Sequence, residues 1–157
     1  MKCFKMEDEN MGVAFKDVNF SRLVDKLSPC CLSENICIVC ERETCLVGYG
    51  TECIKNCMIN KVTYVIDGCK NIPIMDTRIY DKEYIMDGVA DILRTCKSCK
   101  ENHYENCVVN ILRSCYEVIL FGEEKEYKGN ALVYLNDLKG SNPEMADKLF
   151  QKYMIRG

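Results

Sequence analysis

The chain has 157 residues, of which 29% are charged, and its formal net charge is −3. This length suits one domain, and acidic and basic residues alternate along it instead of forming a basic stretch, which disfavours nucleic-acid binding. No apolar run approaches the roughly 20 residues that a bilayer-spanning helix needs. We therefore expect one cysteine-rich domain over residues 13–157, preceded by a flexible N-terminus at 1–12, with no nucleic-acid or membrane partner.

The cysteine content is the most informative part of the composition. Thirteen cysteines accompany one histidine and no tryptophan. Such a density is typical of a secreted disulfide scaffold or of soft-metal chemistry. Residues 1–10 carry acidic side chains and no apolar signal-peptide core. We therefore expect a cytoplasmic protein with reduced thiols, in which clustered cysteines more often serve metal or redox chemistry.

The N-terminal half predicts two helices and one strand. A short helix is expected over 20–27, with Asn19 as its cap. Residues 30–50 have few long apolar side chains and two glycines, so we expect an irregular segment that a bound metal would stabilise. A helix at 51–60 and a strand at 62–66 follow.

The C-terminal half predicts stronger helices. Asp81 is placed to cap a helix whose apolar positions recur at three and four residues from Ile85 onward. The pattern over 104–121 is also helical, with Gly122 as its C-terminal stop. Asp67, Asp76 and Asp81 surround a proline-containing turn, and we expect a solvated acidic loop there, with cation binding as the alternative.

The last part of the chain completes the expected fold. Residues 131–138 are compatible with helix or strand, and Asn142-Pro143-Glu144 is typical of a helix start. We expect a mainly α (α+β) fold: a compact helical domain with a short strand or hairpin element and an irregular, cysteine-rich N-terminal segment.

The first cysteine constellation has the spacing of a thiolate metal site. A Cys-x2-Cys step brings two thiolates to one soft metal, and later cysteines complete the tetrahedron. The spacing leaves two ligand sets open. For a [4Fe–4S] cluster the set is Cys37, Cys40, Cys45 and Cys53; for Zn²⁺ it is Cys37, Cys40, Cys53 and Cys57.

The Cys-x2-Cys-x4-Cys-x7-Cys spacing of the first set resembles the cluster-binding segments of carbon monoxide dehydrogenases and hybrid-cluster proteins. The resemblance is carried by the cysteines alone. It implies cluster ligation and no particular activity. The alternative is that these cysteines pack as small apolar residues, as free cysteine commonly does.

A second constellation lies near the middle of the chain. Its members are Cys96, Cys99, His103 and Cys107. In one unbroken helix they would span about 16 Å, too far for a single mononuclear site. A break near the polar residues 100–102 would instead allow a Cys3His zinc site between two helices. For Cys107, burial in an amphipathic helix is an equal alternative.

Three functions fit these patterns. The first is a small metal or iron–sulfur protein in electron transfer, cluster handling or redox sensing, acting with an unknown redox or regulatory protein partner. The second is a zinc-stabilised interaction module without catalysis, and the third is a Cys-x2-Cys thiol redox protein. One histidine and no oxyanion or phosphate-binding motif argue against a hydrolase. The first hypothesis is favoured, because thirteen sulfurs exceed what one structural zinc needs.

Overall fold

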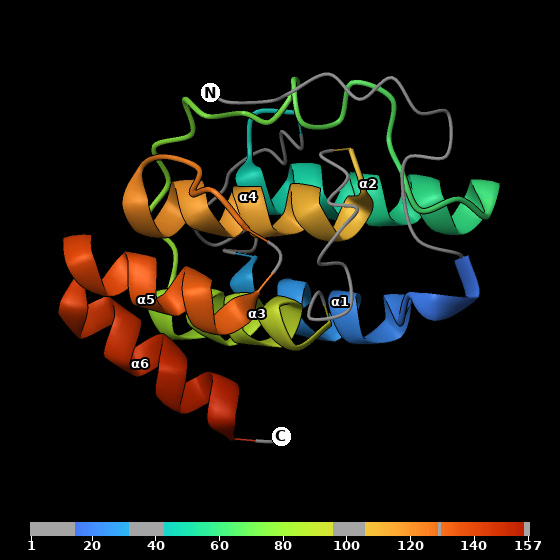
Figure 1. The fold of residues 1–157 in the computed structure, drawn as a ribbon. Helices are drawn as coiled ribbons and strands as arrows, with labels where there is room; N and C mark the ends of the chain where they lie inside the picture. The colour runs from blue at the N-terminus through green and yellow to red at the C-terminus, as the bar shows by residue number, and fades with distance from the viewer. Residues whose placement is uncertain (1–14, 32–42, 96–105, 129, 156–157) are drawn as a thin grey trace.

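The computed structural model describes residues 15–31, 43–95, 106–128 and 130–155. These residues form helices and no named strand, so the expectation of a mainly α fold is confirmed. The six α-helices are α1 (Phe20–Leu27), α2 (Leu46–Asn60), α3 (Lys82–Thr95), α4 (Val108–Phe121), α5 (Ala131–Ser141) and α6 (Pro143–Met154). In Figure 1, α2 and α4 lie above α1, α3 and α5, and α6 lies at the lower edge. None of the described helices is long and apolar enough to cross a membrane.

Helix α4 is the centre of the fold. Every one of its residues is buried except Ile119 and Phe121, which are partly buried. It packs against both α2 and α3. The helix ends at Gly122, whose φ of 77° is the left-handed conformation that glycine adopts at low cost. The predicted stop is therefore confirmed, whereas the helix begins at Val108, later than the expected start near 104.

Three predicted helix starts are confirmed by side-chain caps. Asn19 accepts a hydrogen bond from Arg22 N at 3.0 Å, and Asp81 accepts one from Glu83 N at 2.9 Å. Asn142 accepts one from Met145 N at 3.2 Å, with Pro143 at the first helical position. Each cap pairs a backbone N–H that has no partner inside its own helix.

The prediction of an irregular segment over residues 30–50 is wrong at the C-terminal end of that range. Residues 46–50 are helical, so α2 begins five residues before the predicted start at Thr51. One of the two glycines that suggested a loop, Gly50, instead serves close packing. A Cβ at Gly50 would lie 2.8 Å from Leu112 Cδ2 and 3.2 Å from Leu27 Cδ2. Gly50 therefore lets α2 approach α1 and α4 closely.

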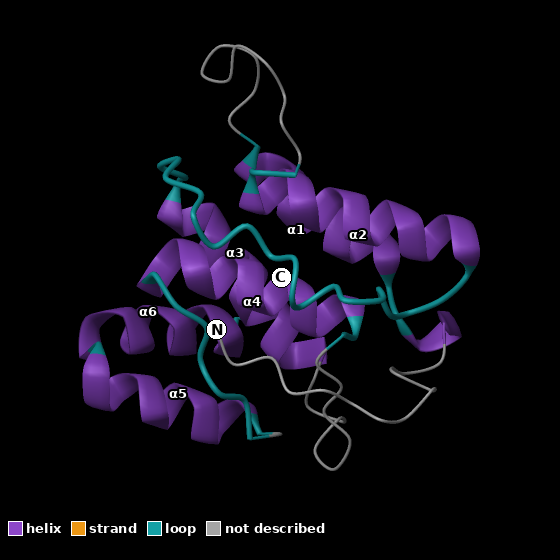
Figure 2. Cartoon of the chain, turned by 90° about the horizontal axis from the view of Figure 1, so that it is seen from above, coloured by secondary structure: helices purple, strands orange, loops and turns teal. Residues whose placement is uncertain are grey.

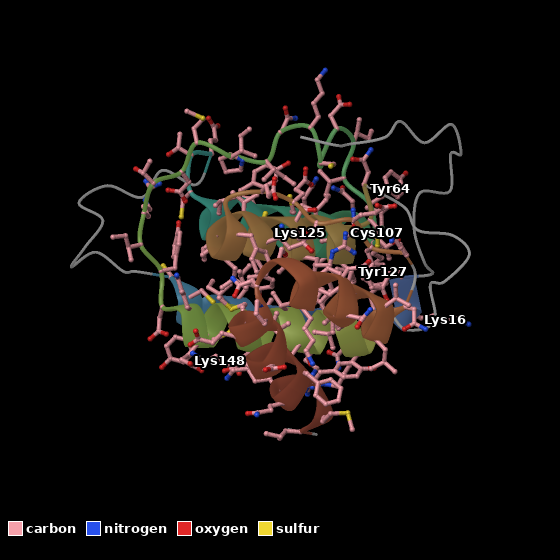
Figure 3. All side chains as sticks on the ribbon, turned by 60° about the vertical axis from the view of Figure 1, so that its left-hand side comes forward. Lys16, Tyr64, Cys107, Lys125, Tyr127 and Lys148 are labelled. Atoms are coloured by element: carbon pink, nitrogen blue, oxygen red, sulfur yellow. The ribbon has the colours of Figure 1, made fainter. Side chains whose placement is uncertain are left out.

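The expected strand at 62–66 is reduced to one antiparallel bridge, between Tyr64 and Cys107. Val108 N donates to Thr63 O at 2.8 Å, and Val65 N donates to Asn106 O at 3.0 Å. The strand-like pairing ends there because the segment that contains Cys107 continues directly into α4. Figure 3 labels Tyr64 and Cys107, which lie next to each other.

The segment that could be helix or strand forms α5, which pairs with α6 as a helical hairpin at one edge of the molecule (Figure 2). The inner side of α6 is fixed to α3. Arg94 Nη1 donates to the carbonyl oxygens of Lys152, Tyr153 and Ile155 at 2.8, 3.0 and 3.2 Å. These bonds satisfy carbonyls at the C-terminal end of α6 that have no helical partner.

The packing of α3 against α4 predicts a large difference between two glycine substitutions. A Cβ at Gly88 would lie 2.5 Å from Cζ of the buried Tyr116, whereas one at Gly140 meets nothing within 4 Å. Gly88→Ala should lower the free energy of unfolding by about 1–3 kcal/mol through overpacking. Gly140→Ala should raise it by roughly 0.5–1 kcal/mol. Urea unfolding followed by circular dichroism measures both, and equal effects would contradict this packing.

Candidate functional site

Four of the predicted metal ligands lie in the described part of the chain. They are Cys45, Cys53, Cys57 and Cys107. The other predicted ligands, Cys37, Cys40, Cys96, Cys99 and His103, lie outside the described residues. Among the described residues, no three His, Cys, Asp or Glu side chains form a group that could hold a metal ion. Both predicted metal sites therefore stay predictions, and the described cysteines can be compared individually.

Cys45 is the N-cap of α2, and it is only partly buried. Its Sγ accepts a hydrogen bond from Gly48 N at 3.4 Å. It also lies 3.0 Å from the hydroxyl oxygen of Tyr80. The sulfur thus lies at the N-terminal end of a 15-residue helix.

The hydroxyl of Tyr80 is held in turn by a buried carboxylate. Tyr80 donates to Asp76 Oδ2 at 2.6 Å, and Asp76 has a fully buried side chain. Burial, together with this hydrogen bond, raises the pKa of Tyr80 well above its usual range, so the hydroxyl keeps its proton. Because that proton is committed to Asp76, a protonated Cys45 must donate to Tyr80. A hydrogen-bonded chain therefore runs from the thiol through Tyr80 to Asp76.

Asp76 also fixes the backbone around Cys45. It accepts hydrogen bonds from Leu46 N at 2.8 Å and from Arg78 Nη1 at 2.8 Å. Arg78 Nη1 donates as well to Thr44 O at 3.1 Å. Burial works to raise the pKa of Asp76, but the bonds from Tyr80, Leu46 and Arg78 outweigh it and lower this pKa below its usual value. Asp76 is therefore an ionised carboxylate that anchors the start of α2.

Cys53 and Cys57 lie four residues apart on one face of α2, as predicted, and both are buried in the core. Burial raises the pKa of Cys53 to about 11 and that of Cys57 to about 12. The Cys57 thiol donates to Tyr64 O at 3.5 Å. These properties are those of protonated thiols that pack as small apolar side chains.

Cys30, Cys107 and Cys115 are also buried. Burial raises the pKa of Cys30 to about 12 and raises that of Cys115 well above its usual range. Cys107 was expected to lie inside a helix over 104–121. In the structure it is the N-cap residue that precedes α4. Cys31, in contrast, is exposed, at the end of the turn that follows α1.

Cys69 is a separate case. It is disulfide-bonded. The expectation that all thiols are reduced therefore does not hold at this position. Experiments on the other cysteines should accordingly use conditions that leave this bond intact.

Sequence reasoning missed the residues that organise Cys45. The acidic residues near the turn were expected to be solvated, which is wrong for Asp76 because its side chain has no exposed surface. The spacing Asp76-x-Arg78-x-Tyr80 placed three hydrogen-bonding side chains two residues apart. That alternation was the available signal, but only the fold brings the three residues to Cys45.

A buried ionic cluster in α4 was also missed. Glu117 accepts hydrogen bonds from Arg113 Nε at 3.2 Å, Tyr134 Oη at 2.5 Å and Lys125 N at 2.9 Å. The Arg113 guanidinium also lies over the ring of Tyr127, 4.8 Å from its centroid. The cluster joins α4 to α5 and to the connection between them, so its role is in the fold.

Comparisons with known proteins leave the site to be judged on its own chemistry. No protein-family model matches the chain, and neither a curated protein nor a solved structure matches it.

Proposed function

We propose that the protein binds a metal ion or an iron–sulfur cluster through thiolates at the start of α2. Cys45 supplies one ligand, and Cys37 and Cys40, which precede it closely in the sequence, supply two more. The observation that carries this proposal is the environment of Cys45. The residue is partly buried, and its sulfur accepts a hydrogen bond from Gly48 N. The site would serve electron transfer, cluster handling or redox sensing with a protein partner.

Helix geometry leads us to leave Cys53 out of this ligand set. Cys53 lies eight positions after Cys45, which corresponds to about 12 Å along the axis of α2. Two thiolates on one tetrahedral zinc ion lie only about 3.8 Å apart, given Zn–S bonds near 2.3 Å. Cys53 is also buried against the core rather than facing Cys45. Cys31 is the exposed cysteine that precedes Cys37 in the chain, so we propose it as the fourth ligand.

The hydrogen bonds around Cys45 support a ligand role. Its sulfur accepts the N–H of Gly48, which fixes the position of the sulfur at the start of α2. Tyr80 contacts the same sulfur and is itself fixed by Asp76. Such contacts around a ligand orient it and adjust its affinity for the metal.

Metal analysis of the full-length protein tests this proposal. The protein is purified without oxygen and without thiol reductants, and its metal and acid-labile sulfide are measured with a visible absorption spectrum. Iron with sulfide and a broad band near about 400 nm would assign an iron–sulfur cluster. Stoichiometric zinc without colour would assign the zinc-stabilised module. Protein without bound metal, which also fails to bind added zinc or iron, would contradict the proposal.

A thiol redox role is the second candidate, because Cys45 is hydrogen-bonded to Tyr80, which Asp76 holds in place. In metal-free protein, this role predicts that Cys45 reacts faster with iodoacetamide than Cys31 does, although Cys31 is more exposed. The Tyr80→Phe variant should slow the reaction at Cys45 alone. Equal rates at the two cysteines would contradict a redox role.

A further inference from the structure

The α5–α6 hairpin has an outward face that none of the other described helices covers. A groove of about 220 Å³ runs between the two helices. Its lining includes Leu132, Asn136, Lys139, Asp147 and Phe150. On α5, positions 132, 136 and 139 follow helical spacing, as do 147 and 150 on α6. Leu132 is 56% exposed and Phe150 is 43% exposed, so the face is partly apolar.

Helix α5 carries exposed apolar side chains on its outer side, beside the polar Asn136 and Lys139. Ala131, Tyr134, Leu135 and Leu138 are buried against the protein, whereas Leu132 and Val133 point outward and are exposed. Exposed apolar side chains that are bordered by polar residues mark surfaces that bind another protein. The inner side of α6 is already fixed to α3 by Arg94 and by Lys152, which lies 2.7 Å from Asp87. A further partner would therefore have to pack on the outer groove.

One positive and one negative side chain line the groove. Lys139 lies on α5 and Asp147 on α6, and both are exposed. Neither forms an ion pair with another described residue, whereas the neighbouring Lys148 and Lys128 pair with acidic side chains at 3.7 and 3.3 Å. A two-fold axis places the same surface on both partners, so Lys139 of each copy can meet Asp147 of the other. One cation and one anion on the same face fit this arrangement.

We propose that the α5–α6 face binds the same face of a second copy of this chain. Leu132 and Phe150 of each copy would be buried in the contact, and two Lys139–Asp147 ion pairs would flank them. The two helices are only about 17 and 18 Å long, so the contact is smaller than the roughly 800 Å² per partner of a standard interface. The dimer should therefore be reversible and concentration-dependent.

Sedimentation equilibrium over a range of protein concentrations tests the proposal with the full chain. The wild-type protein should shift from monomer to dimer as its concentration rises. Lys139→Glu alone, and Asp147→Lys alone, should each weaken the dimer at least about tenfold, because each replaces two attractive contacts with two repulsive ones. A wild-type protein that stays monomeric would overturn the proposal.

Mixing the two single variants is the decisive part of the experiment. Each variant alone should dimerise at least about tenfold more weakly than the wild type, but the pair should form a heterodimer. In the mixed pair the introduced glutamate of one chain faces the introduced lysine of the other, and the natural Asp147 faces the natural Lys139. Lys148→Glu is the matched control, on the same helix as Asp147 but outside the groove lining, and should leave the dimer unchanged (Figure 3). Dimers of undiminished strength in both single variants, or no heterodimer in the mixture, would overturn the proposal.

Discussion

Replacing Glu117 with Ala should lower the free energy of unfolding by about 3–5 kcal/mol, because it removes one partner of a buried ion pair. The Glu117 side chain has no exposed surface, and that of Arg113 is only 4% exposed. The substitution would leave the guanidinium of Arg113 in the core without its carboxylate. It would also remove the acceptor for the hydroxyl of Tyr134 and for the backbone N–H of Lys125. Urea denaturation followed by circular dichroism measures the loss.

Two controls separate the ion pair from other effects at this site. Glu126→Ala removes an exposed carboxylate from the connection that follows α4 and should change stability by less than about 0.5 kcal/mol. The double variant Arg113→Met/Glu117→Leu removes both charges and should be more stable than Glu117→Ala. A loss below about 1 kcal/mol for Glu117→Ala, or a double variant less stable than the single one, would contradict this account.

Replacing Cys45 with Ser should lower metal affinity at least about tenfold, since even substitutions beside a metal ligand typically cost 10–100-fold. The serine hydroxyl is a harder ligand than a thiolate and suits soft metals poorly. It still accepts hydrogen bonds, so α2 should remain capped. The measurement is metal content after anaerobic purification, together with competition against a chelator of known affinity.

Cys53→Ala is the matched control for Cys45→Ser. Cys53 lies on the same helix but is buried, with a pKa of about 11. The substitution should reduce stability and leave the metal content at the wild-type level. Metal loss in Cys53→Ala with full retention in Cys45→Ser would reverse the proposed ligand assignment.

Local rules predicted the helices whose ends are set by nearby residues. Asn19, Asp81 and Asn142 cap helices at the expected positions, because an N-cap needs only a side-chain acceptor and the next few N–H groups. The start of α2 was not predicted, since Gly48 and Gly50 resemble loop residues in sequence. The need for glycine at position 50 comes from tertiary packing, because Gly50 faces Leu112, which is 62 positions further along the chain.

The candidate site was only partly predictable for the same reason. Cysteine spacing identified Cys45 and Cys53 together, but it carries no information about burial, which separates a partly exposed sulfur from a core thiol. The contact between Cys45 and Tyr80 spans 35 positions, and no local pattern specifies it. The ionic pair in α4 was visible as an i, i+4 spacing, yet only the packing of α5 shows that it is buried.

Mapping of cysteine reactivity in the wild-type protein tests the central claim most directly. Metal-loaded and chelator-treated samples are labelled with iodoacetamide in the native state, and each modified cysteine is located by mass spectrometry. We predict that metal protects Cys31, Cys37, Cys40 and Cys45 together and that chelation exposes all four to the reagent. Identical labelling of Cys45 with and without metal would contradict the proposal that this residue is a metal ligand.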